Sequence, residues 1–126
     1  MSVTLDVAQA TATTGGLRLR ASDAEAAVVR YEMTTHTLTL DTTAAGYASP
    51  GIGQAVVPPG RDGKLRLRIL VDRSSVEVFT EDGVVLTARV YPRYEQSTAV
   101  EAFAVGGELR LHTVQAWRMR SAWSDR

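Results

Sequence analysis

The sequence contains no cysteine, no asparagine and only two histidines among its 126 residues. Without cysteine there can be no disulfide, no thiolate nucleophile and no cysteine-bound zinc. His36 and His112 lie far apart in the sequence, so they give little support to a histidine metal site. We therefore predict neither a metal nor a cofactor.

An excess of charge of either sign is also missing, because 14 Lys and Arg residues balance 14 Asp and Glu residues. Nucleic acid or an anionic lipid surface would call for a basic patch, so we expect neither partner. No apolar run is long enough to span a membrane, and residues Met1 to Ala10 lack the basic start and apolar stretch of a signal peptide. The length suits one domain with a core, and we predict a single module over residues 1–126.

Apolar and polar residues alternate through much of the chain, which is the period of half-buried strands. Turn formers separate these runs, and no stretch predicts a helix convincingly. The pattern therefore predicts an all-β fold, an antiparallel β-sandwich of the jelly-roll, concanavalin-like type. Before residue 63 the expected strands are Val3–Val7 (followed by a polar run, Thr11–Gly16), Leu17–Ala21, Ala27–Met33 and Thr37–Asp41.

Near the C-terminus, alternation predicts three more strands, and Gly106-Gly107 is expected to form a hairpin turn between the first two. Trp117 should close the core, whereas Trp123 lies in a polar tail. The three strands are Thr98–Val105, Glu108–Thr113 and Val114–Met119.

The centre of the chain reads LRLRILVDRSSVEVFTEDGVVLTARVY and predicts two successive hairpins. Across the first turn, Val71 should pair with Val76 and Ile69 with Val78. At the second turn a two-residue loop would place Leu86 opposite Phe79, whereas a three-residue loop with a left-handed Gly83 places it opposite Val78. We favour the latter register because it alone collects the apolar residues on one face. Those residues are Leu65, Leu67, Ile69, Val71, Val76, Val78, Leu86, Ala88 and Val90.

The opposite face then carries a mixture of charged and aromatic side chains: Arg66, Arg68, Leu70, Glu77, Phe79, Thr87, Arg89 and Tyr91. A carboxylate, guanidiniums and aromatic rings on one surface suit a ligand with many hydroxyls, because charged groups make strong hydrogen bonds and rings offer an apolar platform. The alternative is a solvated face with weak ion pairs.

Glycine and proline interrupt the pattern between Asp41 and Gly63, which we interpret as the longest irregular segment. Such a loop is either a binding loop or a cover over the open end of the sandwich. Tyr47 lies in it, close to Asp41 in the sequence, and could reach a ligand.

The string VDRSSVEVFTEDG, with LRLRIL before it and VVLTARVYP after it, closely resembles the C-terminal β-sandwich domain of glycoside hydrolase family 32, which includes levanases, inulinases and invertases. LRLRAS and LTLD occur in the same order in that domain, so the resemblance covers roughly residues 17–117. It extends to the fructan-binding modules of carbohydrate-binding module family 66. One departure is Thr42–Gly46, where the family commonly has Arg-Ser-x-Ser-Gly.

The resemblance implies that the chain is not itself a hydrolase, because the two carboxylates of such enzymes come from a separate N-terminal propeller. The family's WMNDPNG motif needs asparagine and its Glu-Cys motif needs cysteine, and this sequence has neither residue. The Arg-Asp-Pro motif has only Arg61-Asp62-Gly63 as a counterpart. The resemblance also implies an extracellular location as part of a secreted enzyme.

Two functions of different class follow from the resemblance. The first is a module that binds a terminal fructosyl unit of levan or inulin, with Glu77 accepting hydrogen bonds and Arg89 donating them. Its further candidate residues are Tyr47, Phe79 and Tyr91 for apolar contact, and Asp41 and Asp72 at strand ends. The second is a structural domain that supports the catalytic propeller or dimerisation, in which Glu77 would form an ion pair with Arg68 or Arg89.

Overall fold

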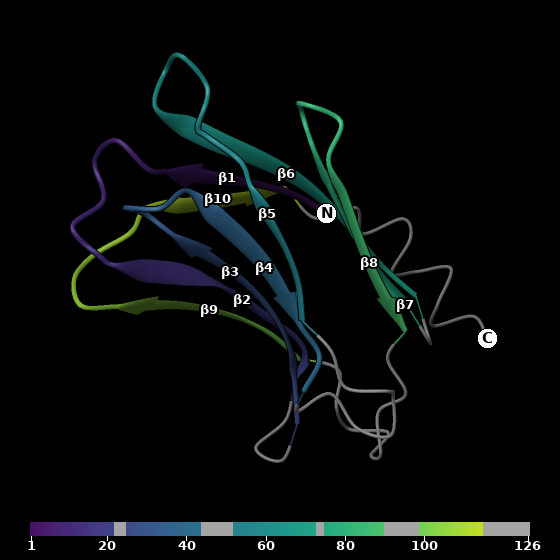
Figure 1. Cartoon of the computed structure of the whole chain (residues 1–126). Coiled ribbons are helices and arrows are strands. Elements are labelled where there is room, and N and C mark those ends of the chain that lie inside the picture. Colours follow the sequence, from purple (N-terminus) through teal and green to yellow (C-terminus); the bar gives the residue numbers. More distant parts are fainter. Residues whose placement is uncertain (22–24, 44–51, 73–74, 90–98, 115–126) are drawn as a thin grey trace.

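A computed structural model shows two five-stranded antiparallel sheets packed face to face, which confirms the predicted β-sandwich (Figure 1). The structure describes residues 1–21, 25–43, 52–72, 75–89 and 99–114. Sheet A has the strand order β10-β1-β6-β7-β8, and sheet B has the order β5-β4-β3-β2-β9. The strands are β1 (Ser2–Asp6), β2 (Thr14–Ala21), β3 (Ala27–Glu32), β4 (Thr37–Asp41), β5 (Ile52–Val56), β6 (Lys64–Val71), β7 (Ser75–Thr80), β8 (Val85–Arg89), β9 (Ala99–Val105) and β10 (Leu111–Val114). The described residues include no helix long and apolar enough to cross a membrane.

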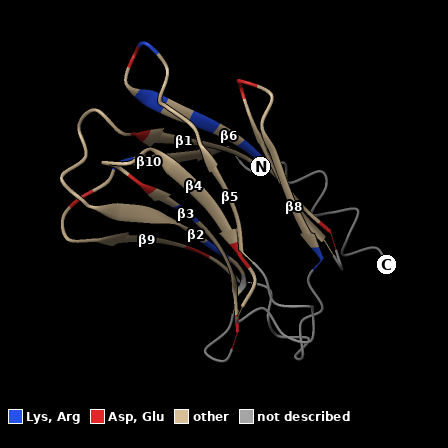
Figure 2. Ribbon diagram, viewed as in Figure 1, with Lys and Arg blue, Asp and Glu red and all other residues tan. Residues whose placement is uncertain are grey.

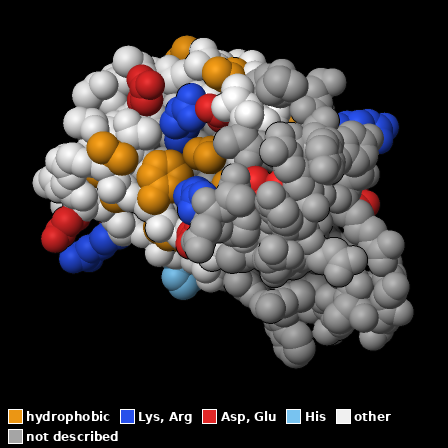
Figure 3. Space-filling view, turned by 90° about the horizontal axis from the view of Figure 1, so that it is seen from below, with side chains coloured by type: hydrophobic (Ala, Val, Ile, Leu, Met, Phe, Trp, Pro, Cys, Tyr) orange, Lys and Arg blue, Asp and Glu red, His pale blue; other side chains and the backbone are white. Residues whose placement is uncertain are grey.

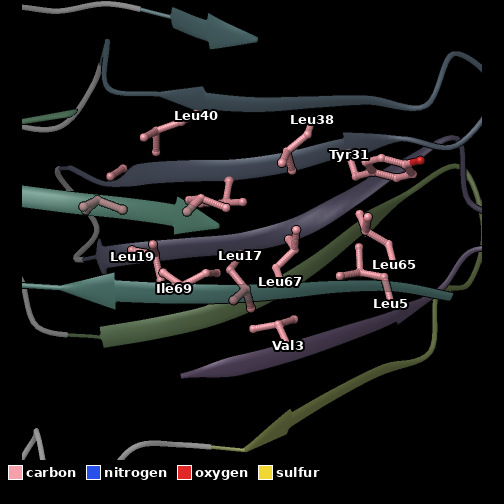
Figure 4. Packing of buried hydrophobic residues seen from close by; sticks show 14 of the residues in the cluster. Val3, Leu5, Leu17, Leu19, Tyr31, Leu38, Leu40, Leu65, Leu67 and Ile69 are labelled. Atoms are coloured by element: carbon pink, nitrogen blue, oxygen red, sulfur yellow. The ribbon is translucent and has the colours of Figure 1, made fainter. Parts of the chain in front are cut away.

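The core lies between the two sheets and is built from alternate residues of nearly every strand (Figure 4). Leu5 and Ile69 point into it from sheet A, and Leu19 and Leu38 point into it from sheet B. Tyr31 is fully buried, and its hydroxyl donates a hydrogen bond to the Val57 carbonyl oxygen at 2.6 Å. This bond satisfies a polar group that would otherwise be costly to bury.

Both central hairpins have the predicted register. Val71 pairs with Val76 and Ile69 with Val78, and Val78 pairs with Leu86 across the next turn. Gly83 has φ of 87°, a conformation that favours glycine, as the three-residue loop requires. The apolar residues on the predicted inner face of β6 and β7 are accordingly buried, namely Leu65, Leu67, Ile69, Val71, Val76 and Val78. The charged residues between them face outward.

The segment between Asp41 and Gly63 is not irregular throughout, and that prediction was wrong at β5. This strand pairs antiparallel with β4, although it contains Gly53, a weak strand former. Its residues are mostly exposed, so an alternating apolar pattern was not needed to hold it. Pairing with β4 decides its structure, and no local signal predicts that pairing. The rest of the predicted loop at residues 44–51 lies outside the described residues.

The predicted hairpin at Gly106-Gly107 does not form, because the strands on either side belong to different sheets. β9 pairs with β2 in sheet B, whereas β10 pairs with β1 in sheet A. The connecting segment is held by the backbone N–H groups of Thr11 and Ala12, which both donate to the Glu108 carbonyl oxygen. The predicted third C-terminal strand, Val114–Met119, does not begin as a separate strand, because Val114 is the last residue of β10. The rest of that prediction, with Trp117 and Trp123, lies outside the described residues.

β2 begins at Thr14, earlier than predicted, and includes Gly15 and Gly16, which the sequence placed in a polar connection. The reason is a close approach of two backbones. A Cβ atom on Gly16 would lie 1.9 Å from the Val29 carbonyl oxygen, so only glycine allows β2 to pair with β3 at this position.

Candidate functional site

Three of the predicted site residues share the outward surface of sheet A. This surface, the Glu77 face, consists of Arg68 and Leu70 on β6, Glu77 and Phe79 on β7, and Thr87 and Arg89 on β8. Glu77 lies between Leu70 and Thr87, its direct neighbours across the two ladders. Arg68 pairs with Phe79 and Arg89 pairs with Ser75, so both guanidinium-bearing residues are diagonal neighbours of Glu77. Figure 2 shows the basic residues along β6.

Glu77 is half-buried as a residue, and its carboxylate forms no ion pair or side-chain hydrogen bond within the part of the chain that the structure describes. Arg89 is exposed and likewise has no such partner there. The ion pair between Glu77 and Arg68 or Arg89, expected of a purely structural domain, is therefore absent from the described residues. Carboxylate and guanidinium groups placed in this way can accept from and donate to the hydroxyls of one small polar ligand.

Arg68 is a residue that the sequence analysis left out of the predicted site. The strand alternation already placed it on the same surface as Glu77, but only the pairing of β6 with β7 sets it beside Phe79. The Glu77 face thus presents one carboxylate between two cationic residues, with an aromatic ring beside one of them. This set of groups resembles the one predicted from sequence, with Arg68 added.

Asp41 lies on the other sheet. It faces outward from β4, where its carboxylate accepts a hydrogen bond from Arg30 at 2.9 Å and others from the backbone and hydroxyl of Thr43. Burial by itself raises the pKa of Asp41, but the bonds from Thr43 and Arg30 outweigh it and leave the pKa below its ordinary value. The outward surface of sheet B around this pair, the Arg30 face, comprises Arg18, Arg30, Thr39, Asp41, Glu101 and Phe103.

The charged groups of the Arg30 face are bonded to one another. Arg30 and Asp41 keep only 29% and 15% of their side chains exposed, and Arg18 pairs with Glu101 on the neighbouring strands. The structure therefore separates Asp41 from Glu77, Phe79 and Arg89, which the sequence analysis had grouped in one candidate site.

The remaining predicted site residues contribute little to the described surface. Asp72 is exposed directly after β6, and its backbone N–H donates to the Ser75 carbonyl oxygen at the hairpin turn. Tyr47 and Tyr91 lie outside the described residues. Among the described residues no group of three His, Cys, Asp or Glu side chains could hold a metal ion.

Comparison with known proteins gives a family for this fold and surface. The family model described as "Glycosyl hydrolases family 32 C terminal" matches residues 1–118. The chain is 29% identical over 116 residues to a fructan beta-fructosidase of Streptococcus mutans, and 29% identical over 115 residues to a levanase of a Bacillus species. In the crystal structure of the exo-inulinase from Aspergillus awamori, a part with 31% sequence identity superposes on 87% of this chain with a TM-score of 0.77.

These relatives are much longer than the chain. It spans 8% of the fructan beta-fructosidase, 12% of the levanase and 23% of the exo-inulinase. The match to the family 32 C-terminal domain confirms the resemblance carried by VDRSSVEVF. The further resemblance to carbohydrate-binding module family 66 stays a prediction.

Proposed function

The chain belongs to the C-terminal domains of glycosyl hydrolase family 32, and we propose that it is a non-catalytic module that binds fructosyl units of fructan on the Glu77 face. The relatives are named for fructan, levan and inulin, which supports this substrate class. The exo-inulinases among them are called extracellular, which supports a secreted parent protein. The missing asparagine and cysteine motifs support the assignment of catalysis to another part of such an enzyme.

One observation carries the proposal: Glu77 is a half-buried residue whose carboxylate has no ion pair or side-chain hydrogen bond in the described structure. A carboxylate that has no partner in the protein adds no hydrogen bond or ion pair to the stability of the fold. A ligand hydroxyl would supply the missing donor, and the guanidiniums of Arg68 and Arg89 would donate to neighbouring hydroxyls. Phe79, also half-buried, would contact the apolar face of the sugar ring.

Isothermal titration of the chain with levan, inulin and fructose tests the proposal. We expect a dissociation constant on the order of micromolar to millimolar, because sugar hydroxyls exchange bonds to water for bonds to protein. Glu77→Gln should weaken binding about 10-fold or more, since it removes a charge-assisted hydrogen bond of about 1.5–3 kcal/mol. Its free energy of unfolding should stay within about 0.5 kcal/mol of the parent protein.

Asp82→Asn is the matched control, because Asp82 is an exposed carboxylate in the turn after β7 and lies outside the Glu77 face. It removes the same charge and should leave the affinity unchanged. Folded protein that gives no heat with any of the three sugars would rule the proposal out. If both substitutions weakened sugar binding equally, the loss of affinity would reflect the overall charge of the protein and not a contact of Glu77.

A second candidate function, support of the catalytic part of the enzyme, is favoured by exposed large apolar side chains. Val56 keeps 69% and Ile52 54% of its surface exposed, both on the outward side of β5. An interface with another domain would cover such residues. In the isolated chain these exposed side chains should instead cause self-association into oligomers without a fixed size. Val56→Lys should reduce this self-association. A chain that shows no such association at about 200 μM would count against this function.

A further inference from the structure

The three charged residues of the Glu77 face lie on one diagonal across sheet A. Arg68 on β6 pairs with Phe79, two residues beyond Glu77 along β7. Arg89 on β8 pairs with Ser75, two residues before Glu77. Glu77 is therefore the midpoint between the two arginines. With strands about 4.8 Å apart and about 3.4 Å per residue, the Cα atoms of Arg68 and Arg89 are separated by about 16–17 Å.

The two arginines are available to a ligand. Arg68 and Arg89 are exposed, and neither forms an ion pair or a side-chain hydrogen bond in the part of the chain that the structure describes. Arg66, the next outward residue of β6, differs because it pairs with Asp62 and Glu81. Since neither Arg68 nor Arg89 is bonded to Glu77, the three charged groups stand apart along the diagonal.

Apolar side chains complete one half of the diagonal. Phe79 is the direct neighbour of Arg68, and Leu70 is the direct neighbour of Glu77. Both are half-buried, so they form an apolar floor between the two charged groups. We call this four-residue array the Phe79 subsite: Arg68, Leu70, Glu77 and Phe79.

Hydroxyl-bearing side chains complete the other half. Thr87 is the direct neighbour of Glu77, and Ser75 is the direct neighbour of Arg89. Thr87 is exposed and Ser75 is half-buried. We call this array the Thr87 subsite: Ser75, Glu77, Thr87 and Arg89. Each subsite measures about 4.8 Å across the strands and about 6.8 Å along them, which is about the footprint of one sugar ring.

The outward side of sheet B has its charged groups arranged differently. There Arg30 is bonded to Asp41 and Arg18 to Glu101. In the view from below, several basic side chains accordingly lie next to acidic ones (Figure 3). A ligand would have to break these ion pairs before it could bind, whereas the diagonal on sheet A needs no such rearrangement.

We propose that the Glu77 face binds two consecutive fructosyl units of one chain, one in each subsite, with the Glu77 carboxylate accepting hydrogen bonds from both. This inference rests on the proposed fructan binding and specifies an oligosaccharide as its ligand. One unit lays its apolar ring face on Phe79 and Leu70. The other unit exchanges hydrogen bonds with the hydroxyls of the Thr87 subsite and receives one from Arg89. The bound chain crosses β7 diagonally, from β6 to β8.

Isothermal titration with a series of fructose oligomers tests the number of units. The sugars are fructose and the disaccharides and trisaccharides of levan and of inulin. We expect the disaccharide of at least one linkage to bind about 10-fold more tightly than fructose, because the second unit adds hydrogen bonds to charged groups. A third unit should add less than about 3-fold, since both subsites are then filled.

Substitution of each arginine tests the assignment of the subsites. Arg89→Gln should weaken binding of the disaccharide at least about 5-fold more than binding of fructose, because fructose alone occupies the Phe79 subsite. Arg68→Gln should weaken the binding of both sugars by similar factors. Arg61→Gln is the matched control, since Arg61 is exposed in the loop before β6 and lies outside the Glu77 face. It removes the same charge and should change neither affinity.

Protein that binds fructose, but binds neither disaccharide more tightly, would overturn this inference and leave the proposed fructan binding in place. Folded protein that gives no heat with any of these sugars would overturn both. Equal weakening of fructose and disaccharide by Arg89→Gln would mean that both arginines serve one unit, which also overturns the inference. If Arg89→Gln fails to fold, as judged by circular dichroism, Thr87→Val replaces it and must also weaken the disaccharide more than fructose.

Discussion

The Glu77 face and the Arg30 face carry the same kinds of group on the outward sides of the two sheets, but they differ in how those groups are bonded. On the Arg30 face, Arg30 is bound to Asp41 and Arg18 to Glu101. On the Glu77 face, the carboxylate of the half-buried residue Glu77 has no such partner in the described structure. A partly buried pair stabilises the fold and leaves few groups for a ligand. An unpaired group adds nothing to the fold and is available for binding.

A carboxylate near an arginine in the sequence can therefore have either role, and the sequence alone does not predict which. Both Asp41 and Glu77 were candidates for sugar binding. The cross-strand neighbours decide between them, because Asp41 lies within reach of Arg30 and Thr43, whereas the direct neighbours of Glu77 are Leu70 and Thr87.

The largest expected effect concerns the backbone beneath the Arg30 face. Gly16→Ala would place a Cβ atom 1.9 Å from the Val29 carbonyl oxygen, which is fixed in the neighbouring strand. We expect a loss of more than about 3 kcal/mol in the free energy of unfolding, measured with urea. Gly53→Ala is the control, since its Cβ would lie 3.8 Å from the Leu86 side chain in ordinary contact. A similar small loss in both variants would contradict the close approach of β2 and β3.

A smaller effect is expected for Tyr31, which is the buried polar group on the inner side of sheet B. Tyr31→Phe leaves the Val57 carbonyl oxygen without its donor and should cost about 1–3 kcal/mol. Burial raises the pKa of Tyr31 to about 12, above its ordinary value. The unfolded chain therefore loses this proton first, and its contribution to stability should fall as the pH rises from about 10 to 12. Urea titrations at alkaline pH should show a shallower decline for Tyr31→Phe, and identical slopes would contradict the assignment.

The Asp41 and Glu77 carboxylates give the most direct comparison of the two faces. Asp41→Asn should cost about 1–2 kcal/mol, because it weakens the bond to Arg30, whereas Glu77→Gln should change the stability by less than about 0.5 kcal/mol. The lowered pKa of Asp41 means that its contribution is complete above the ordinary pKa and is lost as the pH falls below about 4. In urea titrations, the free energy of unfolding of Asp41→Asn should therefore fall less than that of the parent protein as the pH is lowered below about 4. Equal costs for the two substitutions would remove the distinction between the faces.

Much of sheet A could be predicted from the sequence because its information is local. Apolar residues alternate from Leu65 to Val71 and again at Val76 and Val78, on either side of a turn. The left-handed Gly83 fits the three-residue loop, which keeps the apolar residues on one side. The register of β6, β7 and β8 follows from these two facts. β5 and the connection from β9 to β10 could not be predicted in the same way, because both depend on which distant strand is available for pairing.

The fold class, the central registers, the family and the grouping of Glu77, Phe79 and Arg89 on one face could all be predicted from the sequence. These follow from the period of apolar residues and from a specific string of residues. The assembled sheets decide that Asp41 belongs to another face, that Glu77 has no partner among the described residues, and that β9 pairs with β2 alone among the described strands. The physical reason is that hydrogen bonds and ion pairs depend on contacts across strands, which are set when the two sheets assemble.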